Sequence, residues 1–281
     1  MIFKFLIFLM SLDHKDLSYL LEVATVAARL AGQSAMEKIN YVKSSQKSDS
    51  ELVTEADLLC QKIILHTIKQ NFSDHGFIAE EGENNKLFKQ LPRGGDNIYW
   101  AIDPIDGTNN YAKGIYNFAV SIACLHEGTP VLGVIFDPAA DLMFTAVKDA
   151  PAQFNNIRIE AGQNDISMFE AVGIESLFAD GFPKWAIKLS TMLRCRGLGT
   201  TAMHLAYVAK GSFVAAIIEK PKLWDIAAGA FLVETAGGSA TDWQGKSLWP
   251  LDVNNYNGEA IKTLAANKKV HKKMVEILNE R

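Results

Sequence analysis

The stretch WAIDPIDGTNNYAKG, residues 100–114, constrains the fold more than any other part of the chain. Its apolar beginning is typical of a strand that ends in the core, and Asp103 and Asp106 follow where the chain must turn. Pro104 favours an extended residue before it, whereas Gly107 allows a backbone geometry that a side chain would resist. The sequence therefore predicts two carboxylates on a stiff bend at the end of a buried strand, where active sites are often built.

Further acids occupy comparable positions, at the end of an apolar strand or near the start of a helix: Asp57, Glu80, Glu81 and Asp225. An isolated Asp-Pro pair is more often a turn with solvated acids. A whole group of carboxylates is different, because like charges a few ångströms apart raise each other's pKa or need a cation. We therefore expect these acids to form a metal site.

The ligands of such a site would all be oxygen atoms, because the candidates are the carboxylates and the backbone carbonyl of Ile105. Hard oxygen ligands suit Mg²⁺ or Mn²⁺ better than zinc. The spacing of Asp103 and Asp106 lets the two carboxylates face different metal ions about 3.5–4 Å apart, the separation used in two-metal hydrolysis. The pattern predicts phosphoryl-transfer chemistry.

Composition excludes several other classes of protein. The 281 residues are enough for one large or two packed domains, and an apolar content of 48% supplies a substantial core. A net charge of −4 with interspersed acids and bases argues against a nucleic-acid surface or a polybasic membrane face. Three distant cysteines, Cys60, Cys124 and Cys195, are expected to be buried free thiols in a reducing compartment. We therefore expect a cytoplasmic protein that acts on a small molecule, with no nucleic acid or membrane as partner.

The first residues, MIFKFLIFLM, resemble the core of a short signal peptide. The run is too short to span a bilayer, and no small-residue cleavage site follows it. We expect residues 1–12 to be an apolar leader, with Met10 as an alternative start.

In residues 13–150, hydrophobic spacing predicts two helices and a group of antiparallel strands. The helices are residues 16–40 and the segment that follows Thr54, which can cap it. The strands are residues 76–79, the run that ends at 102, 118–125, 131–136 and 143–147, and residues 43–50 and 83–97 are expected to be loops. This half contains most of the predicted metal ligands.

In residues 151–281, strands and helices alternate, which is typical of an α/β fold whose helices cover a sheet. The strands are residues 171–174, 194–196, 213–219, one near Ala240, and 263–266; the helices are 184–193, 201–209, 225–236 and one from Lys268. A soft boundary at residues 149–152 separates the halves, which we expect to form one compact catalytic unit.

Two glycine-threonine segments, residues 107–108 and 199–201, are expected to open helices. The first N–H groups of a helix lack partners within it, so either segment could bind an anion, although the second alone is more often an ordinary cap. Asp225 is expected to act as N-cap and metal ligand together. His204 is expected to be a partly buried structural residue rather than a general acid.

The order of these motifs resembles the inositol monophosphatase family of Mg²⁺-dependent, lithium-sensitive phosphatases. The matching segments, within roughly residues 16–278, are Glu80-Glu81, Asp103-Pro-Ile-Asp-Gly-Thr108, Gly199-Thr200, Trp224-Asp-Ile-Ala-Ala-Gly229 and Ala236-Gly-Gly238. The resemblance implies a five-layer αβαβα sandwich of the inositol monophosphatase and fructose-1,6-bisphosphatase type, usually a homodimer. These motifs are specific for the family but not for its substrate.

The resemblance also implies two to three Mg²⁺ ions. The first is held by Glu80, Asp103 and the Ile105 carbonyl, and the second by Asp103, Asp106 and Asp225. Glu80 with water molecules holds a third, weaker one.

Catalytic and substrate-binding roles follow from the same resemblance. Asp57 and Thr108 orient the attacking water, and Glu80 also belongs to the catalytic group. The residues implied to contact the phosphate or the alcohol attached to it are Asp106, Gly107, Thr108, Gly199, Thr200, Thr201, Glu219 and Asp225.

The leading hypothesis is a phosphomonoesterase that hydrolyses inositol monophosphate or a similar small polyol or sugar phosphate by metal-activated water. Glu219 lies six residues before Asp225, one fewer than in most inositol-specific members, so the substrate stays open. Alternatives on the same fold are a 3′(2′),5′-bisphosphate nucleotidase, a fructose-1,6-bisphosphatase and a histidinol-phosphate phosphatase. A bisphosphate would need a second basic pocket, for which the candidates are Arg194, Arg196, Lys220 and Lys222. A different class is a regulatory interaction protein with the phosphatase fold.

Overall fold

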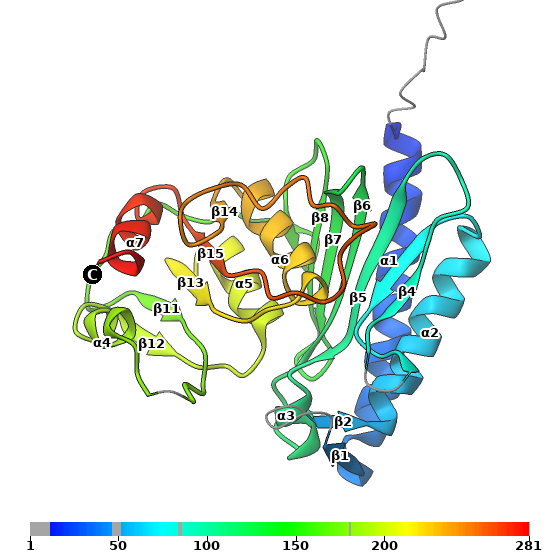
Figure 1. The fold of residues 1–281 in the computed structure, drawn as a ribbon, viewed down its shortest axis with the longest axis horizontal. Helices are drawn as coiled ribbons and strands as arrows, with labels where there is room; N and C mark the ends of the chain where they lie inside the picture. Colours follow the sequence, from blue (N-terminus) through cyan, green and yellow to red (C-terminus); the bar gives the residue numbers. More distant parts are fainter. Residues whose placement is uncertain (1–11, 47–51, 84–85, 180, 281) are drawn as a thin grey trace, which may run out of the picture.

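A computed structural model describes residues 12–46, 52–83, 86–179 and 181–280 (Figure 1). The predicted leader, apart from Leu12, lies outside these residues. In the described part of the chain, the strands form two large sheets, with helices on both sides of each, and one small two-stranded sheet.

The first sheet has eight strands in the described residues, in the order β10-β9-β8-β7-β6-β5-β3-β4. Strands β3 and β5 are parallel, and every other neighbouring pair is antiparallel. The strands are β3 (Gly76–Ala79), β4 (Phe88–Gln90), β5 (Ile98–Asp106), β6 (Ala119–His126), β7 (Thr129–Asp137), β8 (Leu142–Val147), β9 (Gln153–Phe154) and β10 (Ile157–Arg158). The antiparallel pairing predicted for this half is confirmed for β6, β7 and β8, whereas β3 and β5 pair in parallel.

Two long helices cover the outer face of this sheet, α1 (His14–Lys38) and α2 (Glu55–Asn71) (Figure 1). Asp13 begins α1 with a capping box, and Thr54 caps α2 as predicted. Their apolar faces pack on the sheet around buried residues such as Trp100 and Phe118. Between the two helices, the 3-10 turn Ile39–Tyr41 leads to a hairpin of β1 (Ser44–Gln46) and β2 (Leu52–Thr54).

The second sheet has five strands in the described residues, in the order β12-β11-β13-β15-β14. These are β11 (Ala171–Gly173), β12 (Arg194–Arg196), β13 (Ala215–Ile218), β14 (Ser239–Thr241) and β15 (Thr263–Ala266). Its outer face packs on α4 (Lys184–Ser190) and α7 (His271–Leu278) through a separate apolar cluster that includes Trp185 and Met274. The chain passes from one sheet to the other between Arg158 and Ala171, and the division into halves near residue 150 remains a proposal.

Helices α5 (Thr201–Ala209) and α6 (Leu223–Thr235) lie between the two sheets and complete the five layers (Figure 1). Buried residues of both sheets and both helices form one continuous apolar cluster. Helix α6 approaches the first sheet closely, because a Cβ added at Gly133 would lie 2.7 Å from the carbonyl oxygen of Ala228. The short helix α3 (Thr108–Ala112) follows β5. The αβαβα sandwich is the architecture expected from the sequence.

Three local predictions were wrong. Residues 44–46, expected to be loop, form β1, and residues 88–90 within the second expected loop form the edge strand β4. Both strands are short, with little room for a hydrophobic period. Strand β5 also runs on through Asp106, because a bulge lets β5 carry one extra residue between the pairs Asp103–Ser121 and Asp106–Ala119. Pro104 lies in this bulge, where a missing N–H is tolerated.

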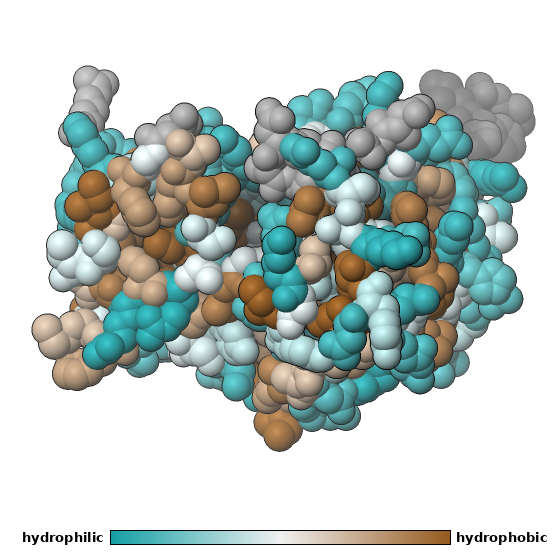
Figure 2. Space-filling view, turned by 90° about the horizontal axis from the view of Figure 1, so that it is seen from below, coloured by the Kyte–Doolittle hydropathy of each residue, from teal (hydrophilic) through white to brown (hydrophobic). Residues whose placement is uncertain are grey.

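The mixed polar and apolar surface and the free cysteines agree with the expectations drawn from composition. Hydrophilic and hydrophobic side chains are interspersed on the face shown in Figure 2. None of the helices in the described part of the chain has the length and apolar character needed to span a bilayer. Cys60, Cys124 and Cys195 are free thiols; the first two are buried and Cys195 is partly exposed.

The contact at Gly133 gives a prediction about stability. Gly133→Ala should lower the free energy of unfolding by about 1–3 kcal/mol, because the new methyl group meets backbone of α6 that cannot move aside. Chemical denaturation measures this change. Gly95→Ala is the control, since no atom lies within 4 Å of its added Cβ. Equal stability of the two variants would contradict the close packing of α6 on β7.

Candidate active site

A cavity of about 330 Å³ lies where the end of β5 meets the start of α5 and the start of α6. Its wall contains all but three of the residues predicted for the site: Glu80, Asp103, Ile105, Asp106, Gly107, Thr108, Gly199, Thr200, Thr201 and Asp225. The three residues outside the wall are Asp57, Glu81 and Glu219. Segments that are far apart in the sequence therefore converge on one cavity, as the motifs predicted.

Asp103 and the residues after it form a tight turn. The Oδ1 atom of Asp103 accepts the N–H of Ile105 at 3.0 Å, and the side chain is only 2% exposed. The Ile105 carbonyl accepts the Thr108 hydroxyl at 3.0 Å. A carbonyl oxygen has two lone pairs, so one remains for another partner.

Asp106 joins the first sheet to α5. Its carboxylate accepts the N–H of Thr201 at 3.2 Å, the N–H of Ala202 at 2.7 Å and the hydroxyl of Thr200. Burial raises the pKa of Asp106 to about 6, although these hydrogen bonds act to lower it. At the start of α5, the N–H groups of Thr201 and Ala202 are therefore occupied by a carboxylate of the chain itself. The expectation that the 199–201 segment offers free N–H groups for an anion is corrected at Thr201, and the next N–H group along the helix, that of Ala202, is occupied as well.

Asp225 occupies a different place in α6 from the predicted one. The helix begins at Leu223 with Lys222 as N-cap residue, so Asp225 is the third helical residue rather than the N-cap. It still caps the helix, because its Oδ2 atom accepts the N–H of Lys222 at 2.7 Å. Tyr256 supports the same turn, since its hydroxyl accepts the N–H of Leu223 at 2.9 Å. The carboxylate is thus held at the cavity from the first turn of α6.

Asp57 lies behind the cavity wall and is fully buried. Its carboxylate accepts the N–H of Thr54 at 2.9 Å and the hydroxyl of Thr108 at 3.1 Å. Burial raises the pKa of Asp57 to about 7, and the negative charge of Glu80 adds to the effect of burial. Thr108 lines the cavity, so Asp57 reaches it through the Thr108 hydroxyl.

Two glycine turns bring the segments around Gly107 and Gly199 close together. Gly107 and Gly199 both have positive φ angles, of 97° and 74°, which glycine adopts readily. A Cβ at Gly107 would lie 3.0 Å from the carbonyl oxygen of Gly199. Asn110 ties the segments by donating its Nδ2 hydrogens to the carbonyls of Asn117 and Leu198, both at 2.8 Å.

The carboxyl groups at the cavity are buried close together, which raises their pKa. Burial raises the pKa of Asp103 and Asp225 well above the usual range, and Glu80 adds to both shifts. Among the described residues, no lysine, arginine or histidine forms an ion pair with Asp57, Asp103, Asp106 or Asp225. This set of carboxylates and one carbonyl oxygen fits Mg²⁺ or Mn²⁺.

The carboxyl groups lie close together at the cavity, but they are not arranged as the ligands of a metal ion. A hydrogen bond joins the side chains of Asp103 and Asp225 and lowers the pKa of Asp225. Within the described ranges, no three acidic, histidine or cysteine side chains surround one ready-made metal position. Binding of a cation therefore requires these carboxyl groups to be deprotonated.

The cavity wall also contains residues to which the sequence analysis gave no role: Leu52, Asn109, Glu175, Ser176, Leu177 and Ile218. Lys220, a candidate for a second phosphate pocket, lines the cavity as well. Glu175 accepts the N–H of Glu219 at 2.7 Å and the N–H of Lys220 at 3.2 Å. The carboxylate of Glu219 lies 3.8 Å from Nζ of Lys262. The predicted contact between Glu219 and the alcohol remains a prediction, and Glu175 is the acid that lines the cavity here. The sequence carries no signal for Glu175 beyond its position just after the 171–174 strand.

His204 is buried, as expected, and also lines the cavity. Its Nε2 atom accepts the N–H of Leu198 at 3.0 Å. Burial lowers the pKa of His204 to about 4, so the ring is neutral near neutral pH. These contacts favour a structural role.

Comparisons with known proteins show the family to which the chain belongs. A model of the inositol monophosphatase family matches residues 16–281. The chain is 32% identical to the Nus factor SuhB of Xylella fastidiosa over 268 residues, covering 90% of this chain and 91% of the relative. It is 34% identical to a fructose-1,6-bisphosphatase/inositol-1-monophosphatase of Thermotoga maritima, covering 82% and 83%. The extragenic suppressor protein suhB of Bartonella henselae has a similar structure, with a TM-score of 0.83, 28% identity and coverage of 93% and 99%.

The raised pKa values predict how stability depends on pH without Mg²⁺. A carboxyl group with a higher pKa in the folded chain stabilises the fold at low pH, and this stabilisation is lost as pH rises through the folded pKa. For Asp57 the window runs from 3.8 to about 7. In EDTA, calorimetry should therefore show a melting temperature at pH 8 below that at pH 5.

Mg²⁺ should reverse this loss, since its ligands must be deprotonated. The rise in melting temperature should be larger at pH 8 than at pH 5, and at pH 8 it should correspond to about 3 kcal/mol at about a hundred times the dissociation constant. Asp103→Asn should remove most of the Mg²⁺ effect, whereas Asp137→Asn, at a buried acid outside the cavity wall, should keep it. Equal Mg²⁺ effects at both pH values would contradict the metal site.

Proposed function

Because the chain belongs to the inositol monophosphatase family, we propose that it is a Mg²⁺-dependent phosphomonoesterase. Its substrate is inositol monophosphate or a similar small polyol or sugar phosphate. The observation that carries this proposal is the convergence of Glu80, Asp103, Asp106 and Asp225 on one cavity. Such a group of carboxylates binds cations, and cations bind phosphate.

We assign the ligands of two to three Mg²⁺ ions as the family pattern implies. Glu80, Asp103 and the Ile105 carbonyl would hold one ion, Asp103, Asp106 and Asp225 would hold a second, and Glu80 with water molecules would hold a third, weaker one. When bound, the ions neutralise phosphate charge and make a bound water more acidic. The lone pair of Ile105 that Thr108 does not use supports this assignment.

Asp57 and Thr108 position the attacking water. The Thr108 hydroxyl can direct its hydrogen to the Asp57 carboxylate or the Ile105 carbonyl, at 3.1 and 3.0 Å. Its oxygen lone pairs then face the cavity and can accept a hydrogen from water. A pKa of about 7 in Asp57 suits a group that takes a proton near neutral pH. Backbone N–H groups of Gly107 and Thr108 would orient the phosphate.

The alcohol part of the substrate lies on the other side of the cavity. Ser176 and Glu175 offer a hydroxyl and a carboxylate there, next to the segment 199–201. A cavity of about 330 Å³ with these polar groups favours a compact polyol or sugar. Glu219 stays a second candidate for a hydroxyl contact.

The name of the Thermotoga relative joins fructose-1,6-bisphosphatase to inositol-1-monophosphatase, so a sugar bisphosphate is the alternative substrate with the most support. A bisphosphate nucleotide and histidinol phosphate remain further alternatives. The name Nus factor SuhB of another relative supports a second proposal, a regulatory role through protein partners. A homodimer and a cytoplasmic location also remain proposals.

Asp103→Asn tests the phosphatase proposal. Mg²⁺-dependent phosphate release from a panel of inositol, sugar, nucleotide and histidinol phosphates should fall by at least about a hundredfold, because a shared ligand is lost. Asp137→Asn, outside the cavity wall, is the matched control and should keep its activity. Undiminished release by Asp103→Asn would show that the metal-site assignment is wrong. A cellular phenotype that survives in this inactive variant would favour the regulatory role.

Thr108 gives a second test at the same site. Thr108→Val removes the hydroxyl and should lower kcat by about 10²–10⁴ with a smaller change in KM, as expected for a group that assists proton transfer. Thr108→Ser keeps the hydroxyl and should retain most activity. Equal kcat values for the two variants would exclude the proposed role of the hydroxyl.

A further inference from the structure

The alcohol side of the active-site cavity contains an acid, Glu175, that the chain itself holds in place. Glu175 lines the cavity shortly after β11. Its Oε1 atom accepts the N–H of Glu219 at 2.7 Å and the N–H of Lys220 at 3.2 Å. Among the described residues, both hydrogen bonds to this carboxylate go to Oε1. A carboxylate has about four lone-pair sites, so Oε2 can accept hydrogens from a ligand.

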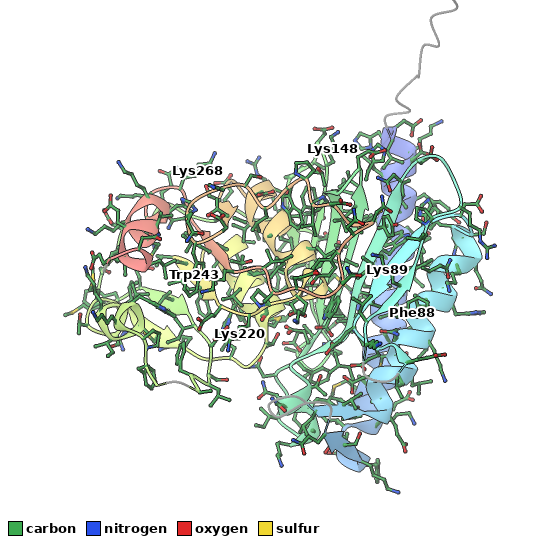
Figure 3. All side chains as sticks on the ribbon, viewed as in Figure 1. Phe88, Lys89, Lys148, Lys220, Trp243 and Lys268 are labelled. Atoms are coloured by element: carbon green, nitrogen blue, oxygen red, sulfur yellow. The ribbon has the colours of Figure 1, made fainter. Side chains whose placement is uncertain are left out.

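Glu219, in contrast, does not line this cavity. Its Oε1 atom lies 3.8 Å from Nζ of Lys262, and the same ammonium group lies 4.5 Å from the centre of the Trp243 ring. Trp243 belongs to the apolar cluster on the outer side of the second sheet. In the view of Figure 3, Lys220 lies toward the first sheet and Trp243 lies away from it. The carboxylate of Glu219 therefore faces Lys262, whereas Glu175 faces the cavity.

Little positive charge opposes Glu175 on this side of the cavity. Of the four basic residues considered for a second phosphate, Lys220 lines the cavity, and Arg194, Arg196 and Lys222 do not. Lys220 is exposed, whereas Glu175 is partly buried, so solvent and salt screen the lysine more strongly than the acid. Burial raises the pKa of Glu175, although the two backbone N–H groups and the charge of Lys220 act to lower it.

The residues beside Glu175 give the wall a mixed character. Ser176 also lines the cavity, and its hydroxyl can both donate and accept. Leu177 and the buried Ile218 contribute apolar side chains to the same wall. A polyol has hydroxyl groups at its edge and C–H groups on its carbon skeleton, so both kinds of side chain find a partner on it.

We infer that Glu175 selects the alcohol part of the substrate, with its Oε2 atom accepting hydrogens from the hydroxyl groups of an uncharged polyol. The inference rests on the proposed function and chooses among its substrates. Hydrogen bonds to a charged acceptor are about twice as strong as neutral ones, and an alcohol without hydroxyls would leave the acceptor unpaired. The same charge opposes a second phosphate on the alcohol. A polyol monophosphate is therefore favoured over a sugar bisphosphate.

The test compares three substrates in Mg²⁺. Cyclohexyl phosphate has the six-membered ring of inositol 1-phosphate without its hydroxyl groups, and fructose 1,6-bisphosphate carries a second phosphate. For each variant, kcat/KM for the other two substrates is divided by that for cyclohexyl phosphate, so that general losses of activity cancel. Glu175→Gln removes the charge but keeps an oxygen for the two backbone N–H groups. It should lower the inositol ratio by about tenfold and raise the bisphosphate ratio.

Three further variants separate this role from others. Glu175→Ala removes the acceptor altogether and should lower the inositol ratio at least as much as Glu175→Gln. Glu219→Gln should lower it less, because the Glu219 carboxylate faces Lys262. Glu276→Gln removes the same charge on α7, where Glu276 lies 3.6 Å from Lys273, and should leave both ratios unchanged.

An equal change for all three substrates in Glu175→Gln would overturn the inference, because Glu175 would then only support the turn at residues 219–220. A larger effect of Glu219→Gln than of Glu175→Gln would also overturn it, in favour of Glu219. Failure of the unaltered chain to release phosphate from any of the three would instead refute the proposed function. Calorimetric titration in Mg²⁺ then tests Glu175 separately, and equal affinity for inositol 1-phosphate and cyclohexyl phosphate would overturn its role.

Discussion

The structure depends on the way Asp106 serves two neighbours at once. The residue ends β5 of the first sheet, and its carboxylate accepts the N–H groups at the start of α5 and the hydroxyl of Thr200. A negative charge at a helix N-terminus is favourable, so this contact both attaches α5 to the first sheet and keeps the carboxylate oriented at the cavity. The site and the packing of the middle layer are therefore built by the same interaction.

Much of the fold and the metal side of the site could be predicted because their signals are local. Thr54 and Asp57 are three residues apart and form a capping box, which a sequence pattern detects directly. The bend from Asp103 to Asp106 is likewise encoded by its own proline and glycine. Asp225 was placed correctly at the cavity but wrongly as N-cap, because the true N-cap residue, Lys222, carries no side-chain signal for a helix start.

The substrate side was harder to predict because it is assembled from long-range contacts. Glu175 reaches the cavity by accepting backbone N–H groups from the segment after β13, which a pattern along one strand cannot reveal. Lys89 lies on a three-residue edge strand within an expected loop, and carbonyls more than 160 residues away orient its ammonium group. Contacts of this kind join segments that are far apart in the sequence, so a family pattern that indicates the chemistry does not identify the substrate.

The buried carboxylates also bear on the choice between an enzyme and an interaction protein. Carboxyl groups whose pKa is raised by burial reduce stability when they ionise, and unpaired buried charges are among the strongest destabilising features of a protein. An interaction protein could use the same surface with amides or apolar residues in place of Asp103 and Asp225, and would be more stable at neutral pH. The presence of this group, oriented by capping bonds toward one cavity, is easier to explain if cations bind there and act on phosphate. A regulatory role, where it exists, would then be added to catalysis rather than replace it.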